Sequence, residues 1–168
     1  MERWGADLYG QPCTTCGFDW SMDPTTARAL VLTLPDRLAQ VTAGRAGTER
    51  HADLGWDVTE YVCHVGDNLR SWAERLAAGW LAGRRDVTGY DPDALAQARG
   101  YSALPLAVAL WSLQASVILW VASVDRALAA DVTLEHATRG PQRALDVARN
   151  NAHDAVHHEH EIARILAG

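Results

Sequence analysis

The chain has 168 residues, a formal net charge of −6 and a sequence pI near 5.6. This length fits one domain with a sizeable core, and an acidic balance without a stripe of Lys and Arg excludes nucleic acid as an expected partner. The N-terminus lacks the apolar stretch of a signal peptide, which favours a cytoplasmic location.

The N-terminal segment, residues 1–22, is predicted to be irregular and to pack on the remainder, residues 23–168, because Gly and Pro interrupt any periodicity. A first helix is predicted to begin at Asp23-Pro24, where Asp can cap the helix and Pro occupies its first position. Pro35 should kink this helix or end its first part.

A second helix is predicted from about Trp56 to Ala78, ended by Gly79. Apolar residues repeat every three or four positions along it, which is typical of an amphipathic helix with one buried face. The members of this stripe are Val58, Val62, Val65, Leu69, Trp72 and Leu76.

Residues 80–101 are predicted to form a loop that holds a short helix at 93–98, followed by a third helix from Ser102 to Ala130. The uncharged stretch 103–124 within it is long enough to raise the question of a membrane span. Pro, Ser and Gln interrupt this stretch, and no cluster of positive charge flanks it. We therefore expect this third helix to be the most buried helix of the bundle and to have no contact with a membrane.

Residues 132–136 are predicted to form a short extended or hairpin-like excursion that Gly140-Pro141 closes at the start of a fourth helix. That helix should run to Ala167, since residues 142–167 contain no Gly or Pro. Four amphipathic helices with one long connection predict an all-α four-helix bundle. The expected apolar stripe of the fourth helix is Leu145, Ala148, Ala152, Val156, Ala163 and Leu166.

Four of the seven histidines lie within eight residues of the fourth helix. His153 and His157 are four residues apart, so on a helix they share one face at about 5–6 Å between Cβ atoms. His64 occupies a similar place beside the stripe of the second helix, and three imidazoles would leave an open coordination position, as in catalytic metal sites. Solvated helix histidines are the alternative that spacing leaves open. His158 and His160 point elsewhere and are expected on the surface.

Three polar residues lie about one helical turn from these histidines: Glu60, Asp67 and Asn150. Each is a candidate to orient an imidazole or to take a proton from bound water. A solvated polar row is the alternative for each. His51 and His136 lie in predicted loops and could approach the same site.

The pair Cys13 and Cys16 has the spacing of half a zinc knuckle or of a redox pair, but no second Cys-x-x-Cys completes it. Three outcomes stay open: a separate structural zinc site with His51 or another histidine, a disulfide, or two free thiols. Cys63 is expected to be a small core residue.

Two segments, Trp56–Asp67 and Gly140–His158, resemble the DinB/YfiT-like superfamily, which includes the N-terminal domain of mycothiol-dependent maleylpyruvate isomerases. The likeness extends over roughly residues 24–166. It implies a four-helix bundle that binds a divalent metal, often zinc or nickel. The implied ligands at the matching positions are His64, His153 and His157.

The resemblance further implies a metal-dependent S-transferase or isomerase that uses a low-molecular-weight thiol such as mycothiol on a small electrophilic substrate. A hydrolase that uses metal-activated water is one alternative, and a non-catalytic metal-binding stress-response module is another. A homodimer is an expectation from the resemblance alone. The chain lacks the paired Glu-x-x-His motifs of di-iron bundles and the His-Glu-x-x-His motif of zincins.

Overall fold

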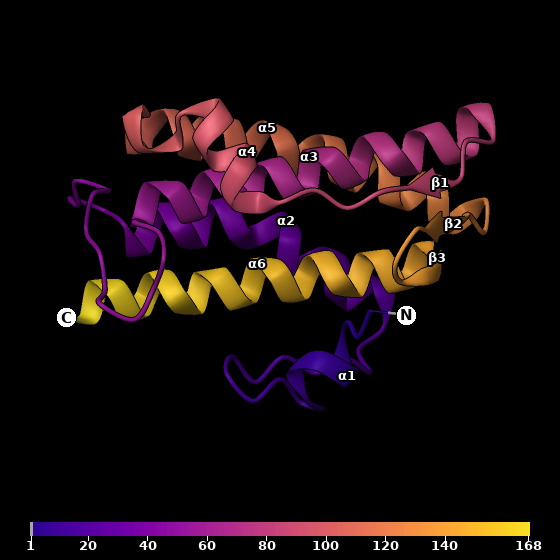
Figure 1. Cartoon of the computed structure of the whole chain (residues 1–168), viewed down its shortest axis with the longest axis horizontal. Helices are drawn as coiled ribbons and strands as arrows, with labels where there is room; N and C mark the ends of the chain where they lie inside the picture. Colours follow the sequence, from indigo (N-terminus) through magenta and orange to yellow (C-terminus); the bar gives the residue numbers. More distant parts are fainter. Residues whose placement is uncertain (1) are drawn as a thin grey trace.

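The computed structural model describes residues 2–168 and consists of four long helices with a small sheet at one end (Figure 1). The long helices are α2 (Pro24–Val41), α3 (Val58–Ala82), α5 (Leu106–Ala129) and α6 (Ala144–Ala167). The predicted four-helix bundle is confirmed. The shorter elements are α1 (Ala6–Tyr9), α4 (Pro92–Arg99), a 3₁₀ turn (Tyr101–Ala103) and the strands β1 (Asp86–Val87), β2 (Thr133–His136) and β3 (Gly140–Arg143).

Capping residues set where the first two long helices begin. The carboxylate of Asp23 accepts hydrogen bonds from backbone N–H groups of the first turn of α2, as predicted. That helix continues through Pro35 instead of ending there. At the start of α3, Asp57 and Glu60 form a capping box, in which each side chain accepts a hydrogen bond from the other's backbone N–H.

The predicted end of α3 at Gly79 is wrong, because the helix extends to Ala82 and is capped by Gly83 in the left-handed conformation, at φ 63°. Gly79 is a glycine for a packing reason. A Cβ atom there would lie 3.0 Å from the side chain of Val132 and 3.1 Å from that of Leu134. The small residue therefore lets the β2 hairpin approach the helix closely.

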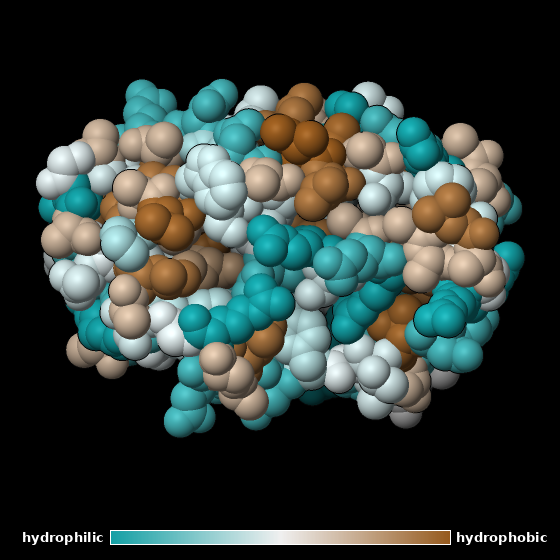
Figure 2. Space-filling view, turned by 90° about the horizontal axis from the view of Figure 1, so that it is seen from above, coloured by the Kyte–Doolittle hydropathy of each residue, from teal (hydrophilic) through white to brown (hydrophobic). Residues whose placement is uncertain are grey.

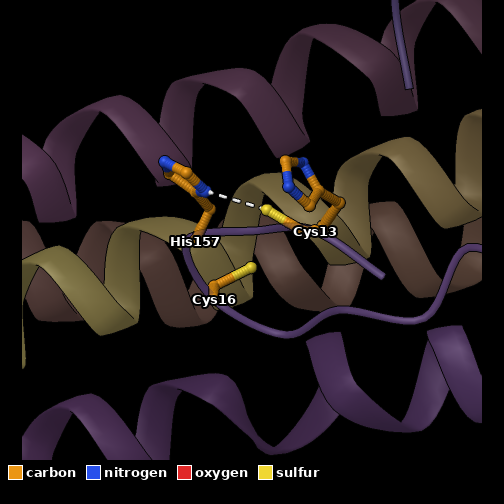
Figure 3. A group of neighbouring side chains, drawn as sticks. Cys13, Cys16 and His157 are labelled. Carbon is orange, nitrogen blue, oxygen red and sulfur yellow. Dashed lines mark hydrogen bonds between the residues drawn. The ribbon is translucent and has the colours of Figure 1, made fainter. Parts of the chain in front are cut away.

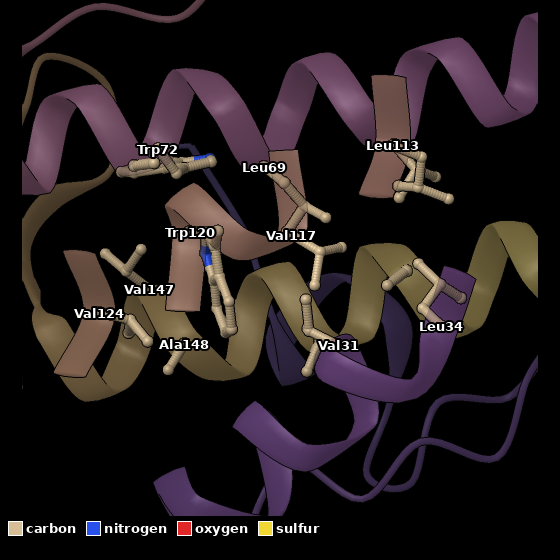
Figure 4. Close-up of a cluster of buried hydrophobic side chains, with 14 of the residues drawn as sticks. Val31, Leu34, Leu69, Trp72, Leu113, Val117, Trp120, Val124, Val147 and Ala148 are labelled. Atoms are coloured by element: carbon tan, nitrogen blue, oxygen red, sulfur yellow. The ribbon is translucent and has the colours of Figure 1, made fainter. Parts of the chain in front are cut away.

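The hydrophobic core lies between the four long helices, and Trp120 of α5 is its largest fully buried side chain. The indole Nε1 of Trp120 donates a 2.8 Å hydrogen bond to Oδ1 of Asn151, which is also fully buried. All six apolar residues predicted for the buried stripe of α3 are buried. Figure 4 shows the surrounding core side chains, including Val31, Leu34, Leu69, Trp72, Leu113, Val117, Val124, Val147 and Ala148.

The prediction that the third long helix is the most buried one is wrong. One face of α5 packs into the core, but Trp111 on its outer face is 71% exposed, and Val108, Ile118 and Leu119 are exposed as well. By length and composition alone, α5 would be able to span a membrane. Figure 2 shows the molecule from above the view of Figure 1, which is the side on which α4 and α5 lie. This surface carries separate hydrophobic patches among polar residues.

The sheet joins the predicted hairpin to a strand that the sequence did not indicate. β2 pairs antiparallel with β3, and β1 pairs in parallel with the other edge of β2. The N-terminal segment is largely irregular, as expected, apart from the single turn of α1. It lies along α6 on the side away from α3 and α5 (Figure 1), with Cys13, Phe18 and Trp20 buried.

Candidate metal centre

Where α3 faces α6, one group of side chains converges in the manner of metal ligands: His64, Asp154 and His158, called here the His–Asp–His cluster. Their ligand atoms all lie within 4.8 Å of one another. Nε2 of His64 is 3.7 Å from Oδ1 of Asp154, and Nε2 of His158 is 3.5 Å from the same oxygen. Two ligands of one zinc ion, each about 2.0–2.2 Å from the metal, are separated by about 3–3.5 Å. The two separations from Oδ1 of Asp154 are therefore close to those between ligands of one zinc ion.

Helical spacing explains why these side chains meet. Asp154 and His158 are four residues apart on α6, and His64 and Asn68 are four apart on α3, so each pair occupies one helix face. Trp56, which precedes α3, covers the cluster, with its ring centroid 4.8 Å from that of His64. The three cluster side chains are 12–23% exposed, so the site is sheltered but open to a ligand.

Two further residues fix the orientation of the cluster. Nδ2 of Asn68 donates a 2.7 Å hydrogen bond to Oδ2 of Asp154, which leaves Oδ1 directed at the two imidazoles. Oε2 of Glu161 lies 2.6 Å from Nδ1 of His158, which directs Nε2 of that ring toward the same point. Such supporting contacts on the far side of each ligand are typical of metal sites.

The charges of the cluster stabilise one another. Burial would raise the pKa of Asp154, but the adjoining imidazoles of His158 and His64 bring it well below its usual range. Burial would lower the pKa of His158, but Asp154 and Glu161 raise it to about 9. Without metal, the cluster therefore holds a carboxylate and an imidazolium at neutral pH.

A second group of ligand atoms lies on a neighbouring face of α6: Cys13, Cys16, His153 and His157, called here the Cys–His cluster. Sγ of Cys13 lies 3.8 Å from Nδ1 of His157, and the side chain of Cys16 points toward them from the next turn of the chain (Figure 3). Burial, together with the charge of His157, lowers the pKa of His153 to about 4. Burial likewise raises the pKa of Cys16 to about 11.

The N-terminal segment covers His153 with aromatic rings. The ring centroids of Trp20 and Tyr9 lie 4.4 Å and 4.5 Å from that of His153, and Phe18 lies 5.4 Å away. His153 is only 3% exposed as a result.

The structure thus divides the expected triad between two clusters. His64 lies with Asp154 and His158, whereas His153 and His157 lie with the two cysteines. The expectation that His158 is a surface residue needs correction, because its side chain is only 17% exposed, whereas His160 is exposed as expected.

Two of the three supporting residues expected from the sequence make other contacts. Glu60 accepts hydrogen bonds from the Asp57 backbone and from Arg50 at the start of α3. Asp67 accepts hydrogen bonds from Arg99, at 2.5 Å, and from the hydroxyl of Tyr101.

Among the other expected residues, Asn150 lines the cavity beside the His–Asp–His cluster. His136 lines it too, from β2, whereas His51 hydrogen-bonds within its own loop, to the backbone N–H of Asp53. Cys63 is buried in the core as expected.

Sequence reasoning missed Asp154, His158, Asn68 and Glu161. The signal for the first two was present, since Asp154-x-x-x-His158 has the same spacing as the histidine pair that was chosen, and carboxylates also bind zinc. Nothing in the spacing alone decides which of the two pairs faces α3.

A cavity of about 340 Å³ lies against the His–Asp–His cluster. Arg75 and Arg139 line it and bring positive charge to it, and Nη2 of Arg139 also lies 3.6 Å from Oε1 of Glu2. The N-terminal segment forms part of its wall. The cavity-lining residues from that segment are Trp4, Gly5, Leu8 and Tyr9.

The solved structure of YfiT from Bacillus subtilis has a similar fold, with a TM-score of 0.75 and 16% sequence identity over 84% of this chain and 85% of that chain. YfiT is described as "a probable metal-dependent hydrolase with an unusual four-helix bundle topology". No family model and no curated protein matches the sequence. This chain therefore has the fold of YfiT, which agrees with the four-helix bundle that the resemblance in sequence implies.

Proposed function

We propose that the protein is a metal-dependent hydrolase that acts on a small, negatively charged substrate. The observation that carries the proposal is the convergence of Nε2 of His64, Oδ1 of Asp154 and Nε2 of His158 at the wall of the cavity. Two imidazoles and one carboxylate, with further positions open, are typical of catalytic zinc sites in hydrolases. The description of YfiT, which shares the fold, gives independent support.

The residues present fit a divalent ion. The donor set is two nitrogens and one oxygen, and the distal atoms of Asp154 and His158 are held by Asn68 and Glu161, so the side chains are positioned before any ligand arrives. His64, Asp154 and His158 would hold the ion, and the chemistry it would supply there is polarisation of the substrate and a lowered pKa of water, to about 7.

The cavity supplies groups that can bind the substrate. The guanidinium of Arg75 lies over the ring of Trp72, 4.8 Å from its centroid, and Nη2 donates a 2.8 Å hydrogen bond to the backbone oxygen of Thr88. These contacts fix the charge in place. Together with Arg139 on the same cavity, Arg75 favours a substrate that carries a carboxylate or another anionic group.

His136 supplies a hydrogen-bond donor to the cavity. Burial lowers its pKa, so the ring is neutral at pH 7. The backbone N–H of Thr138 donates a 3.3 Å hydrogen bond to Nδ1, which leaves the ring proton on Nε2. A neutral imidazole held in this way can donate to a developing negative charge on the substrate.

The proposal is tested by adding zinc, nickel or manganese singly to metal-stripped protein and measuring hydrolysis of small esters and amides, with and without a carboxylate. We expect turnover that needs the metal and no thiol. Asp154→Asn should lower kcat at least about a hundredfold, and Arg139→Ala should raise KM only for the carboxylate-bearing substrates.

The matched control is His160→Ala, which removes an exposed histidine of the same helix and should leave turnover unchanged. Full activity in Asp154→Asn, or no hydrolysis with any of the metals, would contradict the proposal.

A thiol-dependent transfer reaction is the second candidate. The observation that favours it is the positive charge of Arg75 and Arg139, because low-molecular-weight thiols such as glutathione carry carboxylates that these groups can bind. The same assay separates the two candidates. Turnover of an electrophilic substrate that starts only when a thiol is added would replace the hydrolase assignment.

A further inference from the structure

We propose that the Cys–His cluster is a second, structural metal site, in which Cys13, Cys16, His153 and His157 bind one zinc ion and fasten the N-terminal segment to α6. This site is separate from the His–Asp–His cluster and does not depend on the function proposed for it. Its ligand class is a tetrahedral Zn²⁺ with two thiolates and two imidazoles, and the two thiol protons pass to solvent on binding.

The ligand atoms already lie close together. One sulfur or nitrogen from each of the four residues lies within 4.8 Å of all the others. In a tetrahedral site with Zn–S of about 2.3 Å and Zn–N of about 2.0–2.1 Å, a sulfur and a nitrogen lie about 3.6 Å apart. The 3.8 Å between Sγ of Cys13 and Nδ1 of His157 is close to that value (Figure 3).

The backbone brings the two cysteines together without help from side chains. The N–H of Gly17 donates to the carbonyl oxygen of Cys13 at 2.8 Å, and the N–H of Cys13 donates to that of Phe18 at 2.9 Å. Gly17 adopts φ 74°, a left-handed conformation that favours glycine. This tight turn directs both thiols at α6.

A second observation points to a ligand at this place. Nε2 of His153 is buried and has no hydrogen-bond partner among residues 2–168. A buried imidazole nitrogen left without a partner costs free energy, whereas coordination to a metal would satisfy it. The aromatic rings of Tyr9, Phe18 and Trp20 pack against the imidazole and hold it in position.

The four donor atoms are those that zinc prefers, and their number is typical of a structural zinc site. Two sulfurs and two nitrogens in a tetrahedral arrangement are typical of zinc, and four protein ligands close the coordination shell. The His–Asp–His cluster differs in both respects, since it has three protein ligands and no sulfur.

The position of the Cys–His cluster indicates what a metal ion there would stabilise. Residues 2–22 of the N-terminal segment have one short helix and pair with no strand of the sheet, yet the segment contributes Trp4, Leu8 and Tyr9 to the cavity wall. Metal binding supplies free energy that can order such a segment. The zinc site would therefore hold one wall of the cavity in place.

Zinc content per chain tests the proposal, measured on protein purified and kept under a reductant. We expect about two zinc ions per chain in the unaltered protein and about one in Asp154→Asn, where the His–Asp–His cluster is disabled. Adding Cys16→Ser to Asp154→Asn should remove the remaining ion. Cys63→Ser is the matched control, because it removes a buried thiol outside both clusters.

Cobalt substitution identifies the ligands without relying on the folding of any cysteine variant. Asp154→Asn loaded with cobalt should show the thiolate-to-cobalt charge-transfer absorption of a tetrahedral site. X-ray absorption of its zinc form should show sulfur at about 2.3 Å and nitrogen at about 2.0–2.1 Å.

Three results would overturn the proposal: no metal in reduced Asp154→Asn, a zinc spectrum without sulfur, or a disulfide between Cys13 and Cys16 in the zinc-treated protein. Because the experiment starts from Asp154→Asn, its failure is distinct from a failure of the proposed hydrolase.

Discussion

Oε2 of Glu161 lies 2.6 Å from Nδ1 of His158, and Oε1 of the same carboxylate lies 3.7 Å from Nε2 of His157. One acidic side chain therefore contacts a histidine of each cluster. Its shorter contact is to the His–Asp–His cluster, where it fixes the orientation of the ring and increases the basicity of the coordinating nitrogen.

Replacing Glu161 by Gln should weaken metal binding to the His–Asp–His cluster by about tenfold, because the amide holds the imidazole less firmly than the carboxylate does. The measurement is competition for the metal with a chromophoric chelator. It is made in a Cys13→Ser/Cys16→Ser background, so that only the His–Asp–His cluster binds metal. Glu159→Gln is the matched control, since Glu159 pairs with Arg37 of α2 and contacts neither cluster. Equal effects of the two substitutions would contradict this role for Glu161.

Metal binding to the His–Asp–His cluster should release about one proton at pH 7, because the pKa of His158 is about 9 in the metal-free protein and its ring must lose a proton to coordinate. The apparent affinity should rise by about tenfold per pH unit and level off above pH 9. Calorimetry in buffers of different ionisation enthalpy measures the released proton. A proton count that is the same at pH 7 and above pH 9 would be inconsistent with this assignment.

The stability of the metal-free protein should fall as pH rises toward 9. The folded-state pKa of His158 is raised from 6.5 to about 9, so the stabilisation by Asp154 and Glu161 is fully present below about 6.5 and is lost through about 9. Thermal unfolding in a chelator across this range is the measurement. His158→Gln should flatten the dependence, and an unchanged pH profile in that variant would exclude His158 as its source.

Trp120→Phe should lower the free energy of unfolding by about 1–3 kcal/mol, since it removes the donor to Oδ1 of buried Asn151 and leaves that oxygen without its partner. Urea unfolding followed by circular dichroism gives the value. Trp111→Phe changes the same residue type on the exposed face of the same helix and should stay within about 0.5 kcal/mol of the unaltered protein. A comparable loss in both variants would show that the hydrogen bond does not account for the effect.

The buried face of α3 could be predicted from the sequence because its apolar residues are large and regularly spaced. Val58, Leu69, Trp72 and the other members of its stripe are all buried, so the face that carries His64 was placed correctly. The prediction that Asp67 supports the metal site was wrong by one position. Asn68, rather than Asp67, contacts α6, because a separation of four residues from His64 is nearer to a full number of turns on the side that faces Asp154.

On α6 the same reasoning was right only in part, because alanine dominates the helix and weakens the pattern: Ala148 and Ala152 are fully buried as predicted, but other members of the stripe are not. The predicted stripe included Leu145 and Val156, whereas the most buried positions include Val147, Asn151 and Ala155. The buried face is rotated by less than one residue step, which is about 100°. That rotation is enough to turn the histidine pair of the predicted triad toward the N-terminal segment and the Asp154 pair toward α3.

The partners of Cys13 and Cys16 were beyond prediction for a different reason. Residues 1–22 have no periodicity, and a segment without periodicity carries no information about which surface it covers. Only the folded arrangement shows that the two thiols meet His153 and His157 rather than His51.

Each cluster has its own indole, Trp56 at 4.8 Å from His64 and Trp20 at 4.4 Å from His153. A transition metal such as nickel or cobalt in either cluster would therefore quench the fluorescence of a different tryptophan. Replacing Trp20 by phenylalanine would leave Trp56 to report metal binding to the His–Asp–His cluster. Replacing Trp56 instead would leave Trp20 to report metal binding to the Cys–His cluster. The protein thus carries a natural optical reporter for each of its candidate metal sites.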